Sequence, residues 1–425
     1  MAEKEPDENE EKETVQGSSS KSFHLARIVT AFWLLGLCNN YIYVIMLSAA
    51  HDIIHRVESR PDDLNSTLSA SQSFLGDTGR NCTKLTTGAI LLADIIPTLL
   101  VKFICSFLPF YVHFRILLAV TTGILSLVLV ATSESVLMAI VGVCFASFNS
   151  GLGEITLLSY STNFVLHAVA AWSSGTGGAG LVGSFAYAGM TEGGLTPEQA
   201  LYISIAVPLL MSISFWGILK QPEGFNHICA TDPNEGGQSV TLRTGICDGL
   251  LDKLRFITKL LPYMIPLGLV YYFEYLINSG LFDKLNFQNN SMTKESQFRW
   301  FNVMYQVGVF ISRSSVTWVH FEKIWIMAVL QGINFVVFLL EAIYGFVPNV
   351  WFMFALTFWE GLLGGAAYVN TFYNMSYKID KEQRLFALSI GSIADTVGIV
   401  LSGVTTFPLH EFICGLPFQP VFRWP

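Results

Sequence analysis

Long apolar runs separated by short polar segments dominate this chain. A transmembrane helix needs about 20 predominantly apolar residues, and eleven runs meet that length. Only two connections between runs are long, at 51–85 and 220–259. The pattern therefore predicts an all-α polytopic membrane protein with about eleven transmembrane helices, at residues 25–50, 86–110, 114–132, 135–160, 165–190, 198–219, 260–282, 297–318, 323–345, 349–373 and 384–409.

The composition agrees with lipid as the surrounding solvent. The chain of 425 residues is 52% hydrophobic and only 13% charged, whereas soluble domains carry about 25% charged residues. Residues 1–24 differ from the rest because they are strongly acidic and lack any apolar period, which is typical of disordered segments. We therefore expect a disordered acidic tail in front of a membrane-embedded body.

Lysine and arginine residues divide unequally between the two sides of the predicted topology. With a cytosolic N-terminus, sixteen fall on the cytosolic side and eight on the other, in agreement with the positive-inside rule. The Asn-x-Ser/Thr sequons at Asn65, Asn81 and Asn289 then lie on the lumenal side, where such sites are glycosylated. A fourth sequon, at Asn374, lies on the cytosolic side. We therefore predict a cytosolic N-terminus and glycans on the first three asparagines.

Two short patterns recur along the chain and indicate an internal repeat. A Leu-Gly-Leu motif followed by aromatic residues places Tyr43 opposite Tyr275 at an offset of 232, and a glycine pattern places Gly151 opposite Gly361 at an offset of 210. Many transporters are built from such repeats. The predicted fold is a major-facilitator-like bundle in two pseudo-repeats (6+5), with a six-helix bundle at 25–219 that carries the lumenal loop 51–85, a cytosolic linker at 220–259 and a five-helix bundle at 260–425.

Four acidic residues lie deep within predicted spans: Glu154, Glu274, Glu360 and Asp395. A charge at the bilayer centre costs about 2.5–3.5 kcal/mol on insertion scales, so their repeated presence favours a hydrated chamber between the two bundles. Because burial favours the neutral form of a carboxylic acid, these groups are candidates for proton coupling or for binding a polar substrate. The alternative for each is a structural ion pair or a hydrogen bond between helices.

Further polar side chains are candidates for the transport pathway. Lys102 and Arg313 lie near the cytosolic ends of their spans and could attract an anionic substrate, although long basic side chains also snorkel to headgroups. Asn39, Tyr43 and Tyr275 are expected to line the pathway, although tyrosines are also common at membrane interfaces.

Two glycine-rich stretches allow two interpretations. Small residues permit close packing of helices, whereas a locally unwound or flexible helix could direct its N–H groups at an anionic ligand. The candidates for flexing glycines are Gly175, Gly177 and Gly178, which follow the candidate substrate-binding residue Trp172, and Gly364 and Gly365, which precede the candidate lining residue Asn370.

Signatures of other functional classes were sought in the same sequence. The string from Gly151 to Glu154 lacks the aspartate that membrane aspartyl proteases require, and the cysteines and histidines are scattered without the spacing of a metal site. We therefore expect no catalytic residue and no enzyme activity. No metal ion, cofactor or nucleic-acid partner is expected either.

Five longer strings carry a resemblance to a known family. They are FWLLGLCNNY at 32–41, LLAD at 91–94, WSSGTGGAG at 172–180, SRSS at 312–315 and EGLLGGAAYVNT at 360–371. These strings closely resemble the battenin family, whose lysosomal member is linked to juvenile neuronal ceroid lipofuscinosis, and the resemblance covers about residues 30–415. It implies a polytopic glycoprotein of late endosomes and lysosomes. The family is implicated in clearing glycerophosphodiesters, in lumenal pH control and in basic amino acid handling.

The combined hypothesis is a secondary transporter of lysosomal and late endosomal membranes that works by rocking of two helix bundles. It would export a small anionic phosphodiester together with protons and contribute to lysosomal pH homeostasis. Its expected partners are membrane lipids, this substrate and trafficking proteins on the cytosolic side. Two alternatives stay open, a non-transporting adaptor for endosome–lysosome trafficking and a transporter of basic amino acids such as arginine.

Overall fold

The computed structural model describes residues 23–46, 49, 87–108, 111–221, 250–285, 287, 292 and 294–416. These residues are almost entirely helical and include no β-strand. The predicted glycosylation sites Asn65, Asn81 and Asn289 lie outside the described residues, as do residues 1–22, 51–85 and 222–249.

The first half of the chain is a series of long helices. They are the helix Phe23–Met46, α3 (Thr87–Phe107), α4 (Val112–Ala131), α5 (Val136–Tyr160), α6 (His167–Glu192) and a joined stretch made of α7 (Pro197–Ser204), α8 (Ala206–Ser212) and the π-helical η3 (Ile213–Ile218). A short 3-10 turn, η2 (Ser161–Asn163), follows α5.

The second half continues the same pattern. It contains α9 (Leu250–Tyr275) with its π-helical continuation η4 (Leu276–Leu281) and the 3-10 turn η5 (Phe282–Lys284), then α10 (Lys294–Ser314), α11 (Ile324–Tyr344), α12 (Val350–Lys378), α13 (Lys381–Gly391) and α14 (Ile393–Gly415).

Each of the eleven predicted spans coincides with one of these helices or joined stretches. Within the described parts of the chain, eight stretches are long and apolar enough to cross a membrane by length and composition alone. Helix α9 begins at Leu250, ahead of the predicted start at residue 260. The last predicted span is divided between α13 and α14, which meet at Ser392.

Local sequence signals explain where several helices begin and end. The Ser135 hydroxyl accepts a hydrogen bond from the Met138 N–H at the start of α5. At α7, Thr196 and Gln199 form a reciprocal capping box with a proline at the first helical position, an arrangement that satisfies otherwise unpaired N–H groups. Helix α11 ends at Gly345, whose φ of 53° is the left-handed conformation that glycine adopts without steric cost.

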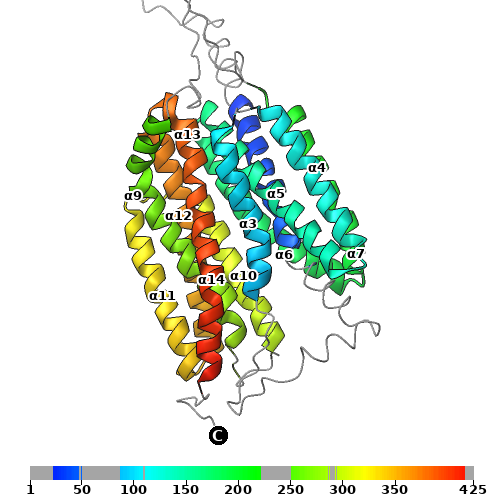
Figure 1. The fold of residues 1–425 in the computed structure, drawn as a ribbon, viewed down its shortest axis with the longest axis vertical. Coiled ribbons are helices and arrows are strands. Elements are labelled where there is room, and N and C mark those ends of the chain that lie inside the picture. The colour runs from blue at the N-terminus through cyan, green and yellow to red at the C-terminus, as the bar shows by residue number, and fades with distance from the viewer. Residues whose placement is uncertain are drawn as a thin grey trace, which may run out of the picture.

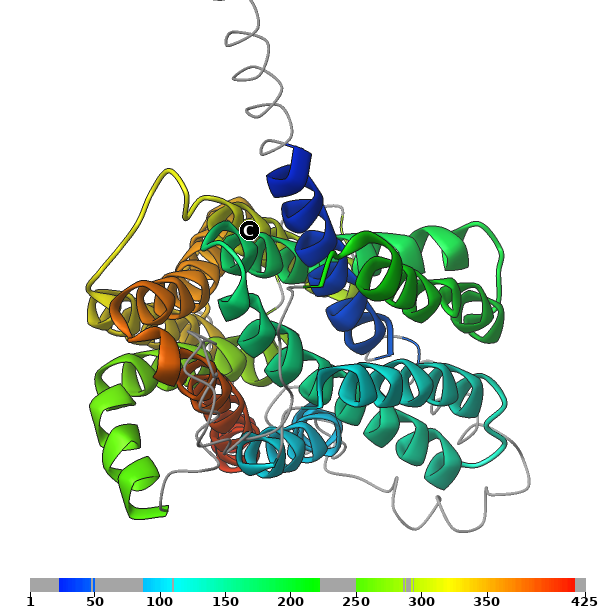
Figure 2. The same ribbon diagram turned by 90° about the horizontal axis from the view of Figure 1, so that it is seen from above.

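The helices run side by side along the long axis, with α4, α5 and α7 on one side and α9, α11 and α12 on the other (Figure 1). The two halves meet where α14 packs against α3 and where α10 packs against α6. Figure 2 shows the same contact from above, with the red α14 beside the light-blue α3. Residues far apart in the sequence thus face one another along the seam between the halves.

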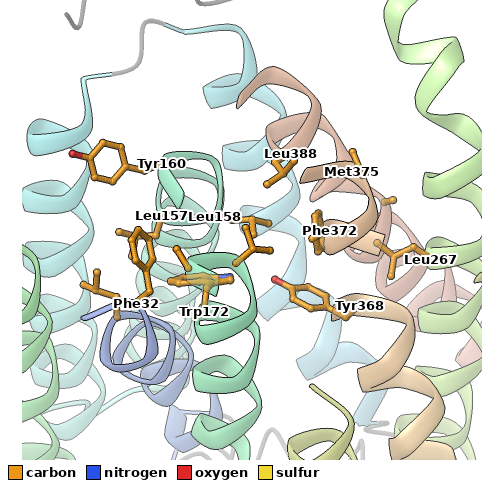
Figure 3. Close-up of a cluster of buried hydrophobic side chains, with 14 of the residues drawn as sticks. Phe32, Leu157, Leu158, Tyr160, Trp172, Leu267, Tyr368, Phe372, Met375 and Leu388 are labelled. Carbon is orange, nitrogen blue, oxygen red and sulfur yellow. The ribbon is translucent and has the colours of Figure 1, made fainter. Parts of the chain in front are cut away.

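The apolar core divides unevenly along this seam. We call the end of the bundle at which η3 ends and α9 begins the linker end. There, one cluster of buried apolar side chains includes members of both halves (Figure 3), among them Phe32, Leu158, Trp172, Tyr368, Phe372 and Leu388. Toward the opposite end, one cluster around Ile45 and Leu127 belongs to the first half alone, and another around Phe301 and Phe354 belongs to the second half alone. The apolar core that the halves share therefore lies mainly toward the linker end and extends along α3 through Ile95 to Leu91.

Candidate functional site

Lys102 of α3 is buried among acceptors at the seam between the halves. Its Nζ lies 2.8 Å from Glu154 Oε2 on α5 and 3.3 Å from Asp395 Oδ1 on α14. It also donates to the Ser392 carbonyl oxygen and to Thr396 Oγ1, each at 2.8 Å. Lys102 is only 1% exposed, so it does not snorkel toward headgroups. Two carboxylates compensate its charge, and the resulting triad ties α3 and α5 to α14.

Tyr368 of α12 connects this triad to a second cation. Its hydroxyl donates to Glu154 Oε1 at 2.8 Å, and the Arg313 guanidinium lies over its ring, 4.2 Å from the centroid. Arg313 also donates to Thr176 Oγ1 of α6 at 2.7 Å and to the Tyr271 hydroxyl at 2.8 Å. Unlike Lys102, Arg313 is only partly buried and forms no ion pair within 4 Å among the described residues.

Glu274 and Glu360 extend the polar site into the second half. The Tyr305 hydroxyl donates to Glu274 Oε1, while Glu274 Oε2 has no hydrogen-bond partner among the described residues. Gly364 of α12 faces this oxygen so closely that a Cβ there would collide with it. Glu360 lies one turn earlier on α12 and is fully buried. The sequence thus placed four carboxylates at depth: Glu154 and Asp395 bind Lys102, Glu274 binds Tyr305, and Glu360 has no hydrogen-bond partner among the described residues. We call these four carboxylates, with Lys102, Arg313 and their hydroxyl partners, the polar region.

Tyr43 and Tyr275, which the repeat places at equivalent positions, lie next to each other at the seam. Their phenol groups lie close enough to interact, and the Tyr275 ring stacks on that of Tyr271 with centroids 6.2 Å apart. Both Tyr43 and Tyr275 are partly exposed. The two side chains therefore bring one phenol group from each half together at the seam.

The glycine-rich stretches pack helices together and do not unwind them. Helices α6 and α12 continue through these runs without interruption, in agreement with the packing interpretation; that these glycines flex during transport stays a prediction. A Cβ at Gly175 would collide with the Trp33 carbonyl oxygen, and Cβ atoms at Gly177 and Gly365 would also come within 3.2 Å of a neighbouring helix. Gly178 leaves more room, with 3.4 Å to the Trp33 ring. Small residues at such positions let helix backbones approach closely.

Three predicted pathway residues lie outside the polar region. Asn39 is fully buried and donates to the Ser150 carbonyl oxygen at 3.1 Å. Trp172 belongs to the apolar cluster shared by the halves (Figure 3). Asn370 accepts from the Phe321 N–H at 2.7 Å and so fixes the connection between α10 and α11. Asn39 Oδ1 and Trp172 Nε1 are buried without a hydrogen-bond partner among the described residues, and the pathway role of all three residues stays a prediction.

Sequence reasoning did not single out several members of the site. Tyr368 lies within a string of mostly small residues and was not predicted as a site residue. Its spacing of eight from Glu360 and four from Gly364 places all three on one helix face, and this was the signal that could have identified it. Thr176 lies between two glycines that drew attention for another reason. Thr396 directly follows Asp395, and this position gave no signal of its own.

The chemistry of the site is that of charge compensation and hydrogen bonding. Among the residues that the structure describes, no group of three or more histidine, cysteine or acidic side chains could hold a metal ion. Arg313, a partly exposed residue, carries the planar donor set that binds phosphate or carboxylate oxygens in pairs. Two of its nitrogens donate to the hydroxyl groups of Thr176 and Tyr271, and its buried Nε has no partner among the described residues. The site is therefore suited to an anionic ligand at Arg313 and to protons on the carboxylates.

Comparison with known sequences identifies close relatives along the whole chain. The family model described as CLN3 protein matches residues 30–244 and 232–416. Battenin of Canis lupus familiaris is 38% identical over 440 aligned positions, which cover 96% of this chain and 97% of that protein. Protein BTN1 of Yarrowia lipolytica is 35% identical, with coverage of 93% and 97%.

Solved structures with the same architecture are more distant in sequence. The human organic anion transporter MFSD10 (TETRAN) matches with a TM-score of 0.62 at 12% identity and covers 92% of this chain and 94% of its own. A bacterial homologue of the human lysosomal transporter Spinster, in an inward-facing and unoccupied conformation, matches with a TM-score of 0.52 at 12% identity, with coverage of 89% and 81%. At these identities the likeness concerns the fold alone, and it confirms the predicted major-facilitator-like bundle.

Proposed function

Because the chain belongs to the CLN3 protein family, which includes battenin, we propose that it is a secondary transporter that exports a small anionic phosphodiester from lysosomes and late endosomes. The solute class that fits the resemblance is the glycerophosphodiesters, which carry one phosphate charge and a polar polyol. Export of such an anion with protons would also contribute to lumenal pH homeostasis. The MFSD10 match supports a transporter fold of this kind.

The observation that carries this proposal is the position of Arg313. Its guanidinium donates to Thr176 of the first half and to Tyr271 of the second, and it remains partly exposed. A phosphodiester could replace these neutral hydroxyl partners with two charge-assisted hydrogen bonds, which are stronger than neutral ones. Lys102 is less suitable because Glu154 and Asp395 already compensate its charge.

The seam between the halves supports transport by alternating access. Contacts near the linker end join the halves through the shared apolar cluster, through the Lys102 triad and through the hydroxyls of Ser159 and Ser389, 2.7 Å apart. Toward the opposite end, the apolar clusters of the two halves are separate. With the predicted cytosolic N-terminus, the linker end faces the cytosol, so this arrangement corresponds to a form closed on the cytosolic side.

The proposal is tested by reconstituting the purified protein into liposomes and measuring uptake of a radiolabelled glycerophosphodiester from an acidic exterior. We expect uptake by the wild-type protein and loss of most of it in Arg313→Lys, because a lysine cannot present a planar pair of donors. The matched control is Arg384→Lys, since Arg384 donates to the Ile379 carbonyl oxygen away from the site. Equal loss in both variants would contradict a specific role for Arg313.

The same vesicles distinguish the alternatives. Uptake of labelled arginine without uptake of the phosphodiester would replace the proposal with basic amino acid transport. That alternative has some support, because the polar region holds four carboxylates against two cations. If neither solute moves, the proposal of a transporter fails in favour of an adaptor with trafficking partners on the cytosolic side.

A further inference from the structure

Glu360 is a buried carboxyl group without a hydrogen-bond partner. It lies on α12 with 0% exposure, and neither of its carboxyl oxygens has a partner among the described residues. A polar group in this situation loses its hydration without replacement, and an ionised one loses far more. The arrangement therefore indicates that the Glu360 carboxyl group carries a proton in the stable form.

A second buried carboxyl group, Glu274 of α9, lies near enough for its charge to act on Glu360. Glu360 and Gly364 lie four residues apart on one face of α12, and Gly364 is the residue against which Glu274 Oε2 rests. That oxygen is also without a partner among the described residues. The two carboxyl groups thus face the same space between α9 and α12 with three unpartnered oxygens.

Neighbouring helices do not supply a cation that would compensate two negative charges. Helix α10 contributes the neutral Tyr305 hydroxyl, which donates to Glu274, and Arg313, whose charge acts on Glu274. Helix α14, which packs against α9, contributes the acidic Asp395, whose own cation is Lys102. On α11, the carboxylate of Glu341 is already bound to the Val347 N–H. Two adjacent buried carboxylates ionise together only at a large cost in free energy. Since Arg313 compensates one of the two negative charges, the binding of one proton makes the group neutral.

The backbone next to the pair is also unusual. The regular helix α9 gives way to the π-helical η4 at Leu276, directly after Glu274 and Tyr275. Single π-helical turns inside α-helices occur frequently at functional sites. One turn before Glu360, the buried Thr357 hydroxyl is likewise without a partner among the described residues. These features distinguish the pair from the fully bonded Lys102 triad.

We infer that Glu360 and Glu274 form a proton-binding site, within the second half of the protein, that holds one exchangeable proton. The inference rests on the proposed transport function, for which it names the coupling ion and its position. Helix α12 begins at the end opposite the linker end, so Glu360 lies about 12 Å nearer to that end than Tyr368, at 1.5 Å per residue.

This position gives a simple coupling scheme between the proton and the anionic substrate. A proton taken from lumenal water neutralises Glu274 or Glu360, and the charge of Arg313 then becomes available to the substrate. Release of the proton to cytosolic water restores the Glu274 carboxylate, which competes with the substrate for Arg313. Binding of the proton and of the anion thereby favour each other.

The test measures protonation directly, without transport. Infrared difference spectra of the purified full-length protein, recorded during a pH titration in lipid, report the C=O stretch of protonated carboxyl groups. We expect a pH-dependent band in the wild type that is lost in Glu360→Gln and altered in Glu274→Gln. The matched control is Glu341→Gln, which removes a buried carboxyl group bound to backbone and should leave the band in place.

The result that overturns the inference is an unchanged band in both Glu360→Gln and Glu274→Gln. Because two variants are tested, misfolding of one of them does not prevent the test. A monodisperse elution profile in size-exclusion chromatography shows that each variant is folded. A separate readout concerns coupling: Glu360→Gln should exchange labelled glycerophosphodiester across the membrane but fail to accumulate it under a pH gradient. If Glu360→Gln accumulates the glycerophosphodiester as well as the wild type does, the inference is also overturned. If the wild-type protein itself moves no glycerophosphodiester, the proposed function is refuted, but the infrared result on the proton-binding site is unaffected.

Discussion

Replacing Lys102 by methionine removes one charge from the centre of the seam while keeping most of the side-chain volume. In the wild type, the ammonium group lies 2.8 Å from Glu154 and 3.3 Å from Asp395, and it donates to two further oxygens, the Ser392 carbonyl and Thr396 Oγ1. In the variant, both carboxylates stay buried and face each other without a cation. We therefore expect a strongly destabilised protein.

The size of the effect follows from the burial of the partners. Lys102 is 1% exposed, Glu154 8% and Asp395 4%, so solvent screens little of the lost interaction. Removal of one partner from a buried ion pair costs about 3–5 kcal/mol, because it leaves an uncompensated charge behind. An exposed ion pair contributes only about 0–1 kcal/mol. The chain offers such a pair in Lys378 and Glu322, 3.7 Å apart.

The assay is thermal unfolding of the detergent-purified proteins, followed by intrinsic tryptophan fluorescence. Lys102→Met should unfold at a clearly lower temperature than the wild type, whereas Lys378→Met should unfold within error of it. Adding Asp395→Asn to Lys102→Met removes one of the two orphaned charges and should recover part of the loss, because residues in one network are not additive.

The pH dependence of the difference in unfolding temperature provides a test that can refute this reasoning. Protonation neutralises the orphaned carboxylates of Lys102→Met, so the gap in unfolding temperature between variant and wild type should narrow as the pH falls. If Lys102→Met unfolds at the wild-type temperature at neutral pH, or if the gap widens in acid, the triad does not hold the seam as described.

Two further changes test the packing and the motion of the bundle. Gly364→Ala places a Cβ against Glu274 Oε2 and should abolish gradient-driven uptake, whereas Gly189→Ala, where nothing lies within 4 Å, should leave uptake unchanged; equal activity of both variants would contradict the close approach. Cysteines introduced together as Ser159→Cys and Ser389→Cys, whose hydroxyls are 2.7 Å apart, should form a disulfide that stops uptake until a reductant restores it, and undiminished uptake by the cross-linked protein would contradict opening at this end.

The sequence was sufficient to predict the helices and the kind of fold. Apolar runs of bilayer length are a strong signal because lipid leaves no alternative to a hydrogen-bonded helix. The charges at membrane depth were equally visible, because each of them interrupts an apolar run. The repeat even indicated that Tyr43 and Tyr275 are equivalent, and the structure places their phenol groups near each other.

The partners of the buried charges could not be predicted in the same way. Lys102 and Asp395 are 293 residues apart in the sequence, and nothing local to either residue specifies that α3 meets α14. The bond of Asn370 to a helix connection likewise depends on how α12 packs, and nothing in its local sequence indicates this partner. At Gly175 of α6, the Trp33 carbonyl oxygen lies too close to leave room for a Cβ. This close approach depends on how the helices pack and cannot be predicted from the sequence of α6 alone.

The apolar cluster shared by the two halves has a thermal consequence. Opening the linker end separates side chains such as Trp172 and Phe372 (Figure 3), and exposure of apolar surface to water raises the heat capacity. Apolar association also weakens on cooling. Cooling should therefore favour the form of the proposed carrier that is open at the linker end over the form that is closed there. Because the heat capacity of the two forms differs, an Arrhenius plot of the transport rate should be curved.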